Sequence, residues 1–234
     1  MLKAAREGKQ ETSWLNPHPR YEKGVSHFIA NILNPACSAE FLDSFESIAR
    51  RIALLGALNS LSQITLKATL PGVPDFYQGT ELWDFSMVDP DNRRPVDYSI
   101  RTSALEGAGT PDWSTLTRDW YDGRLKLAWI RELLRLRQEH PDLFAKGDYI
   151  PLEIHGRDRD HIIAFARRYR RKATIVAVGR WFGRFTDQGR CWLRAQTMEA
   201  EIDLSPVKRF QRERLSIADC FRDLPVTVRI AASQ

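Results

Sequence analysis

The chain has 234 residues, 43% of them hydrophobic and 28% charged, and its 35 Lys and Arg against 30 Asp and Glu give a formal charge of +5. This composition is that of an ordinary globular protein, so it excludes a disordered chain, and the mild positive charge gives no reason to expect a nucleic-acid partner. Three widely spaced cysteines predict neither a disulfide framework nor a Cys-x-x-Cys metal site, and they favour a cytoplasmic protein.

Helices are predicted for much of the first 70 residues. The charged start, MLKAAREGKQ, lacks the apolar core of a signal peptide. Residues 21–33 predict a short helix, and Ser38 is the expected N-cap of the next one. From Phe41 onward apolar residues recur every three or four positions, which predicts one long helical stretch up to Leu70 with Gly56 as its break. Polar residues interrupt this apolar run, so no membrane span is predicted.

Residues 70–98, LPGVPDFYQGTELWDFSMVDPDNRRPVDY, combine turn-formers, aromatics and charged side chains without a helical period. A short strand is predicted near 73–78, closed by Gly79 and followed by a loop over 79–98. In parallel α/β sheets ligands bind beyond the carboxyl ends of the strands, and carboxylates, amides, guanidinium groups and flat rings suit a polyhydroxylated ligand. The candidate binding residues are Tyr77, Gln78, Glu81, Trp83, Asp89, Asp91, Asn92, Arg93, Arg94 and Asp97.

Two interpretations of these side chains stay open from the residues alone. The carboxylates could include the pair of a retaining glycosidase, which must lie about 5 Å apart, or they could cap turns and pair with Arg93 and Arg94. Trp83 and Tyr77 could stack on a sugar ring or pack against the protein.

The run PGVPDFYQGTELW resembles the eighth barrel strand and following loop of the α-amylase superfamily (glycoside hydrolase family 13). The continuation DPDNRRPVDY narrows the resemblance to the malto-oligosyltrehalose synthases, and KAAREGKQETSWLNPHPRYE and DHIIAFARR agree with it. The resemblance implies an intramolecular transglucosylase (a glucosylmutase) of trehalose biosynthesis, which converts the reducing-end α-1,4 linkage of malto-oligosaccharides to α,α-1,1. It also implies that Trp14 lines the substrate cleft, and the alternative that the residues leave open is an aromatic side chain that anchors the start of the chain.

The same resemblance places the catalytic carboxylates outside this chain. In the family they come from barrel strands four, five and seven, and none of those motifs occurs here. A (β/α)₈ barrel needs about 250 residues by itself, so 234 residues that also supply a second region predict the carboxy-terminal portion of a larger enzyme. We therefore expect no catalytic residue, no cofactor and no metal, and an isolated chain without synthase activity. Its expected partners are a malto-oligosaccharide and the missing amino-terminal barrel half, and uncovered apolar faces predict self-association.

The fold class expected is α/β plus all-β, divided into a barrel remnant (1–148) and a β-sandwich (149–234). Residues 99–121 predict an irregular connection with a short helical turn, 122–139 the last barrel helix, and 141–148 a linker. The runs YIPLEI, HIIAFARRY, ATIVAVGRWF, CWLRA and VTVRIA predict antiparallel strands. The basic residues Arg167, Arg168, Arg170, Arg171 and Lys172 predict a solvated hairpin tip rather than a polyanion site.

Two alternatives remain beside the synthase, namely a stand-alone carbohydrate-binding module and a fragment of an α-glucan hydrolase of the same superfamily. Ligand contacts confined to residues 149–234 would favour the module. The product distribution of the complete enzyme would separate synthase from hydrolase. The five histidines lack the spacing of a zinc motif.

Overall fold

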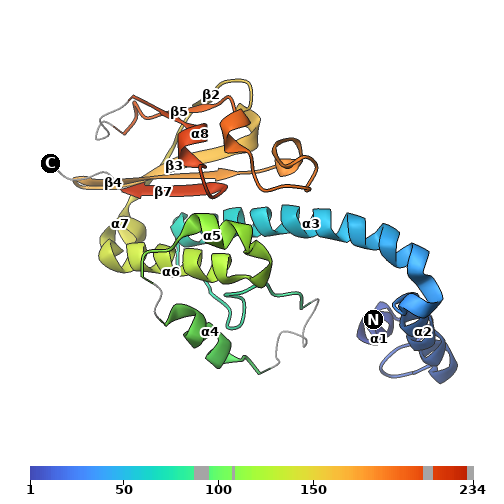
Figure 1. Cartoon of the computed structure of the whole chain (residues 1–234). Helices are drawn as coiled ribbons and strands as arrows, with labels where there is room; N and C mark the ends of the chain where they lie inside the picture. The colour runs from blue at the N-terminus through green and yellow to red at the C-terminus, as the bar shows by residue number, and fades with distance from the viewer. Residues whose placement is uncertain (87–94, 107–108, 208–212, 231–234) are drawn as a thin grey trace. The chain divides into compact units, whose positions relative to one another are not determined.

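The computed structural model describes residues 1–86, 95–106, 109–207 and 213–230. The chain separates into two compact units, an amino-terminal unit (Met1–Ile52) and a carboxy-terminal unit (Ala53–Gln234). Figure 1 labels most of the helices and strands of both units. None of the described helices combines the length and the apolar character needed to cross a bilayer.

The amino-terminal unit consists of α1 (Leu2–Gly8), α2 (Pro19–Ile32) and the first part of α3 (Pro35–Thr69). Helix α2 confirms the helix predicted over 21–33, and it starts with proline in the first turn, where a missing N–H costs nothing. Glu22 is the polar centre of the unit, because it accepts hydrogen bonds from Arg6 Nε at 2.8 Å and Thr12 Oγ1 at 2.7 Å. The bond from Arg6, followed by that from Thr12, lowers the pKa of Glu22 to about 2.

The predicted long helix forms as α3, but its break lies elsewhere. Ser38 has φ −144° and ψ 39°, which are non-helical, so the regular helix begins after the residue predicted as its N-cap. The expected break at Gly56 is wrong, since α3 runs through it without interruption. A single glycine lowers helix propensity by about 1 kcal/mol but removes no backbone donor, and the tertiary contacts of α3 outweigh that cost.

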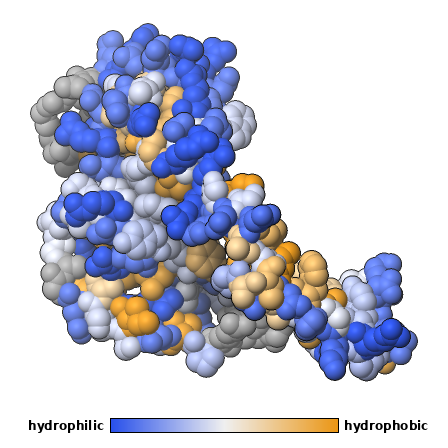
Figure 2. Space-filling model, turned by 45° about the vertical axis from the view of Figure 1, so that its right-hand side comes forward, coloured by the Kyte–Doolittle hydropathy of each residue, from blue (hydrophilic) through white to orange (hydrophobic). Residues whose placement is uncertain are grey.

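One side of the first part of α3 carries an exposed apolar stripe. Phe41, Phe45, Ile48 and Ile52 follow one another at spacings of four, three and four, and their exposed fractions run from 43% to 62%. The rings of Phe41 and Phe45 stack with centroids 5.7 Å apart. We call these four residues the α3 apolar face. Figure 2 colours the apolar residues at the surface orange.

The carboxy-terminal unit contains two antiparallel sheets and a helical layer (Figure 1). The four-stranded sheet has the order β1 (Asp148–Pro151), β3 (Ile162–Tyr169), β4 (Lys172–Gly179), β7 (Val226–Ile230). The three-stranded sheet has the order β2 (Ile154–His155), β5 (Glu201–Asp203), β6 (Arg214–Ser216). The helices are the rest of α3, α4 (Tyr98–Leu105), α5 (Trp113–Arg118), α6 (Arg124–Glu139), α7 (Pro141–Lys146) and α8 (Ile217–Cys220).

Strand β4 lies at the centre of this unit and is covered on both faces. Ile175 and Ala177 belong to a core shared with Ile202 and Leu215 of the three-stranded sheet. On the opposite face, Val178 packs into a second core that includes residues of α3 and α6, namely Leu61, Ile64, Trp129 and Leu133. The helical and β-rich parts of the unit therefore share their apolar burial, which is the main stabilising term in folding.

Most predicted secondary structure beyond residue 98 is confirmed, with four corrections. Residues 141–148 were expected to be a linker, but they hold helix α7 and the start of β1. The helix expected over 122–139 is α6, and the connection 99–121 holds two helices, α4 and α5. The run CWLRA is not a strand, because Cys191 and Arg194 donate their amides to Thr186 and Phe185 in a turn. The short strands β5 and β6 were not predicted.

The predicted strand near 73–78 is also not formed. Residues 73–77 are irregular, and none of the described strands pairs with them. A strand needs a neighbour to accept and donate its backbone hydrogen bonds, and an extended segment without one is not stable as a strand. Helices extend to Lys146 and strands begin at Asp148, so the expected change from mainly helical to β-rich structure is observed. The predicted domain boundary at 148/149 stays a prediction.

Arg167 corrects part of the predicted hairpin tip. Tyr169 pairs with Lys172, so Arg170 and Arg171 form the turn between β3 and β4 as expected. Arg167, however, is 1% exposed. Its guanidinium donates to the carbonyl oxygens of Thr69 at 2.8 Å, Phe144 at 2.9 Å and Gly147 at 2.8 Å, and burial lowers its pKa. The cation lies at the carboxyl ends of α3 and α7, where helix dipoles favour positive charge.

Candidate functional site

The candidate site is the segment between α3 and α4. The structure describes its two ends, residues 70–86 and 95–97. Five of the predicted binding residues, Asp89, Asp91, Asn92, Arg93 and Arg94, lie outside the described residues. The contacts described below are therefore those of the two ends of the loop.

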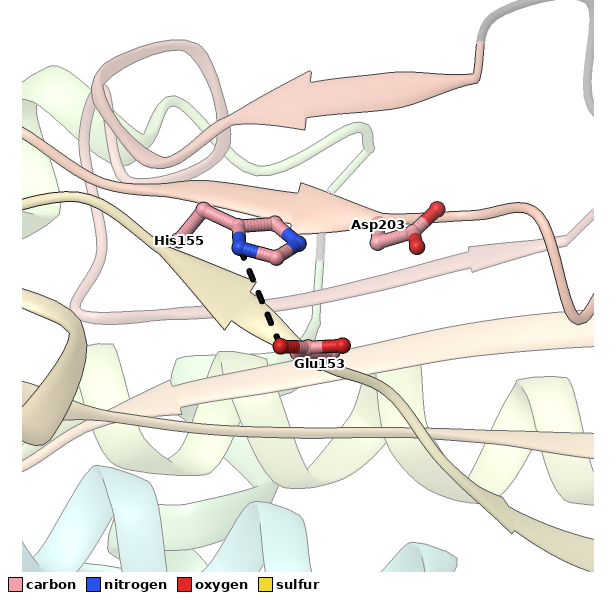
Figure 3. A group of neighbouring side chains, drawn as sticks. All are labelled: Glu153, His155 and Asp203. Atoms are coloured by element: carbon pink, nitrogen blue, oxygen red, sulfur yellow. Dashed lines mark ion pairs between the residues drawn. The ribbon is translucent and has the colours of Figure 1, made fainter.

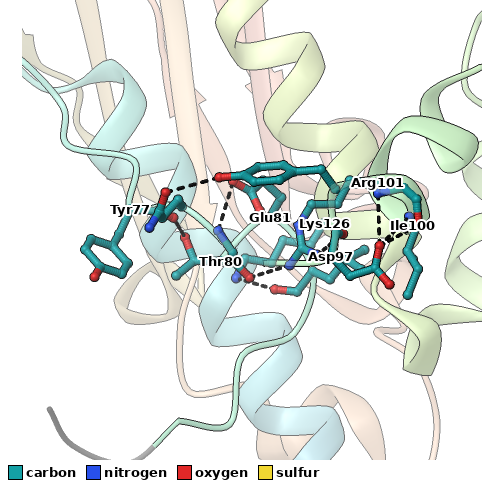
Figure 4. A network of polar contacts seen from close by, with 12 residues as sticks. Tyr77, Thr80, Glu81, Asp97, Ile100, Arg101 and Lys126 are labelled. Carbon is teal, nitrogen blue, oxygen red and sulfur yellow. Dashed lines mark hydrogen bonds and ion pairs between the residues drawn. The ribbon is translucent and has the colours of Figure 1, made fainter. Parts of the chain in front are cut away.

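One arginine joins the two ends of the loop (Figure 4). Arg101 of α4 donates from Nε to Glu81 Oε2 at 2.7 Å, from Nη2 to the carbonyl of Gly79 at 2.6 Å and from Nη1 to the carbonyl of Asp97 at 2.9 Å. Its side chain is 15% exposed and that of Glu81 28%. We call these four residues the Arg101 clamp. A guanidinium with donors in a fixed plane suits this task, because it sets three acceptors in one geometry.

Asp97 uses its side chain to start α4. Its Oδ1 accepts hydrogen bonds from the amides of Ser99 at 3.0 Å and Ile100 at 3.3 Å. Hydrogen bonds from the Ser99 hydroxyl first, and then from these amides, lower the pKa of Asp97. This is the N-cap arrangement, so the structure places Asp97 as a residue that fixes the end of the loop.

The residues before Glu81 form a tight turn. The Tyr77 carbonyl accepts from Thr80 N at 3.2 Å and Thr80 Oγ1 at 2.6 Å, and Tyr77 is 41% exposed. Gln78 Oε1 accepts from the Tyr98 hydroxyl at 3.1 Å. Gly79 has φ +89°, and a Cβ there would lie 3.0 Å from Val96 Cγ2. Both the backbone conformation and the approach of Val96 thus require glycine at this position.

Trp83 is anchored inside the unit. Its Nε1 donates to the Trp120 carbonyl at 2.7 Å, and the two indoles meet edge to face with centroids 6.4 Å apart. Lys126 Nζ lies 5.6 Å from the Trp83 ring centroid and donates to the Leu82 carbonyl at 3.1 Å. Burial lowers the pKa of Lys126. Of the two interpretations left open for Trp83, these contacts favour packing against the protein over stacking on a sugar.

Trp14 belongs to the amino-terminal unit. The residue is 56% exposed, with the Arg6 guanidinium 4.8 Å from the centroid of its ring. Thr12, close by in sequence, is buried and accepts from the His18 amide at 2.9 Å, so this polar segment is fixed within its own unit. A place for Trp14 in the wall of the substrate cleft stays a prediction.

The comparisons with known proteins bear on the whole chain. A putative maltooligosyl trehalose synthase of Mycobacterium tuberculosis is 36% identical over 187 residues, which is 80% of this chain and 22% of that protein. The structure of maltooligosyltrehalose synthase from Arthrobacter ramosus matches with a TM-score of 0.74 and 29% identity, over 98% of this chain and 29% of the solved one. This chain is homologous to part of the maltooligosyltrehalose synthases.

A second solved structure agrees. The Sulfolobus tokodaii hypothetical maltooligosyl trehalose synthase is 34% identical over 75% of this chain and 22% of its own, with a TM-score of 0.63. The chain thus spans between a fifth and a third of the maltooligosyltrehalose synthases it matches. No family model matches the sequence.

The Arg101 clamp was missed in the sequence. Arg101 looks like any charged residue of a short helix, and its partners Gly79 and Glu81 lie about twenty positions away. A weak signal was present, since an arginine four residues after an N-capping aspartate faces back toward the start of its helix.

Proposed function

We propose that this chain is the carboxy-terminal part of a maltooligosyltrehalose synthase and that the complete enzyme converts the reducing-end α-1,4 linkage of malto-oligosaccharides to an α,α-1,1 linkage. The observation that carries the proposal is that nearly the whole chain, 98%, aligns with less than a third of a maltooligosyltrehalose synthase. Its substrate would be an α-1,4-glucan, and its partner the remaining polypeptide. A cytoplasmic location remains a prediction.

We further propose that residues 1–148 complete a (β/α)₈ barrel and that residues 149–234 form the β-sandwich behind it. Residues 73–77 follow α3 and pair with none of the described strands. The last strand of a barrel would be unpaired in this way if the neighbouring barrel strands were missing. The strand would form when the preceding barrel strand supplies its backbone partners.

The α3 apolar face supports the same arrangement. Four large side chains that are 43% to 62% exposed are costly in water, and burying the exposed half of each contributes about half of the roughly 1.5–3 kcal/mol of a fully exposed side chain. We propose that the rest of the polypeptide covers this face in the complete enzyme, and that copies of the isolated chain cover it for one another. Sedimentation of the isolated chain should therefore give a dimer that Phe45→Glu weakens and Asp43→Lys does not. A monomeric wild-type chain would contradict the proposal.

In this reaction the loop after Gly79 would hold the released glucose. A glycosyl-enzyme forms on an aspartate supplied by the rest of the enzyme, and the glucose must turn so that its anomeric hydroxyl attacks in place of water. Asp91, Asn92 and Arg93 offer the acceptors and donors that bind sugar hydroxyls. The Arg101 clamp would fix where the loop begins and ends. Because the catalytic carboxylates lie outside this chain, the isolated chain should have no activity.

The test is a chimera in which residues 1–234 replace the aligned segment of the Arthrobacter ramosus enzyme. We expect maltopentaose to lose its reducing ends without release of glucose. Asp91→Ala and Arg93→Ala should reduce this rate strongly, whereas Arg118→Ala, at an exposed position of α5, should not. Release of free glucose would instead indicate a hydrolase. A folded chimera without either activity would contradict the proposal.

A further inference from the structure

The outer face of the three-stranded sheet carries a second cluster of polar side chains. Strands β2 and β5 pair antiparallel with Ile154 opposite Ile202, and the amide of Asp203 donates to the Glu153 carbonyl at 2.9 Å. Ile154 and Ile202 turn toward the core. Because side chains alternate along a strand, Glu153, His155 and Asp203 all lie on the opposite face of the sheet (Figure 3).

The three side chains are close enough to share one ion. A ligand atom from each lies within 4.8 Å of those of the other two, and His155 Nδ1 is 3.9 Å from Glu153 Oε1. Metal–ligand bonds of about 2.0–2.2 Å in a tetrahedral site would bring these atoms to roughly 3.4 Å from one another. The Glu153 side chain is 73% exposed, so few contacts oppose the rotation that would bring its carboxylate closer to the other two ligands.

Two hydrogen bonds from Ser205 orient the Asp203 carboxylate. Its Oδ1 accepts from the Ser205 amide at 2.8 Å and its Oδ2 from the Ser205 hydroxyl at 3.0 Å. Each carboxylate oxygen keeps a second lone pair, so Asp203 can still coordinate a cation while these hydrogen bonds hold it in place.

The surroundings of the cluster are acidic, although the chain as a whole has a formal charge of +5. Glu201 lies on the same face, in register with His155. Its carboxylate pairs at 3.3 Å with Arg214, which lies opposite Asp203 in the register of β5 and β6, so one cation balances one of the three carboxylates. Glu153 and Asp203 therefore leave a local negative charge that a divalent cation would neutralise.

We propose that Glu153, His155 and Asp203 bind a divalent transition-metal ion of the zinc type. An imidazole with two carboxylates suits zinc and its neighbours, whereas calcium and magnesium prefer oxygen ligands throughout. Three protein ligands leave a fourth position for water. The ion would join β2 to β5, two strands of only two and three residues, and would stabilise the sheet that they form.

The test is equilibrium dialysis of the 234-residue chain against Zn²⁺. A Cys37→Ser background removes the exposed thiol, which could bind zinc by itself. We expect one ion per chain, and a loss of affinity of about tenfold or more in His155→Ala and in Asp203→Asn. The matched control is His27→Ala, which removes an exposed imidazole of α2 and should leave binding unchanged.

Thermal unfolding gives a second measurement. Zn²⁺ should raise the melting temperature of the background chain and not that of His155→Ala, while the two should melt alike without metal. The substitution lies on the surface, so a folded variant is expected, and circular dichroism checks it. The proposal is overturned if the background chain binds no Zn²⁺, or if His155→Ala binds it as tightly as the control.

Discussion

Replacing Arg101 by alanine should open the base of the loop that begins at Gly79. The substitution removes three charge-assisted hydrogen bonds, each of which contributes about 1.5–3 kcal/mol when fully buried. The Arg101 and Glu81 side chains are 15% and 28% exposed, so water replaces part of this interaction. We take about 1 kcal/mol per bond, or roughly 3 kcal/mol in all. Local opening should then become more frequent by about a hundredfold.

Hydrogen exchange followed by mass spectrometry measures this opening directly. The amides of Gly79 and Thr80, which donate to Glu81 Oε1 and the Tyr77 carbonyl, should exchange about a hundredfold faster in Arg101→Ala. Arg101→Lys should give an intermediate rate, because lysine keeps the charge but not the fork of donors. Arg124→Ala, which breaks an exposed ion pair with Asp122, is the control. Unchanged exchange in a folded Arg101→Ala chain would refute the clamp.

Three further predictions concern stability and reactivity. Arg167→Met removes the arginine donors from the carbonyls of Thr69 and Phe144, whose bonds are buried, and of Gly147, whose bond is partly buried. Urea unfolding should therefore show a loss of about 3 kcal/mol, against less than about 1 kcal/mol for the exposed Arg168→Ala. Because the pKa of Glu22 falls from 4.5 to about 2 on folding, the amino-terminal unit should keep this stabilisation above pH 4.5 and lose it as the pH falls toward 2. Glu22→Gln should flatten that dependence in an acid titration followed by circular dichroism. Burial raises the pKa of Cys220 to about 11, so a thiol reagent should modify the exposed Cys37 first and Cys220 far more slowly, and equal rates would contradict this.

The elements that the sequence predicted well are those whose pattern is local. Helix α6 and the hairpin of β3 and β4 carry their own periodicity and turn residues over eight or more positions. Strands β5 and β6 have three residues each, too few for an alternation to be recognised. The segment 73–77 has the composition of a strand, but a strand also depends on a partner, which a local pattern does not reveal.

Side-chain roles were harder to predict than secondary structure, because they depend on contacts between distant residues. The resemblance of residues 70–98 directed attention to the loop, yet Arg101, which joins its ends, stood outside the motif. Arg167 was predicted to be part of a basic hairpin tip, because nothing in residues 167–172, five of which are cationic, marks the one that turns inward. His155 lacks a zinc-type spacing because Asp203 approaches it from another strand.

The double-sided cover of β4 limits how this protein can be divided. A cut at residue 148, where helices give way to strands, would remove α3 and α6 from Val178 and Val226 and leave that sheet face in water. The β-rich part should therefore be insoluble when it is expressed alone from residue 149, and soluble when expressed from residue 53. For recombination between related enzymes, the exchangeable module would begin inside α3 rather than at the start of the sheets.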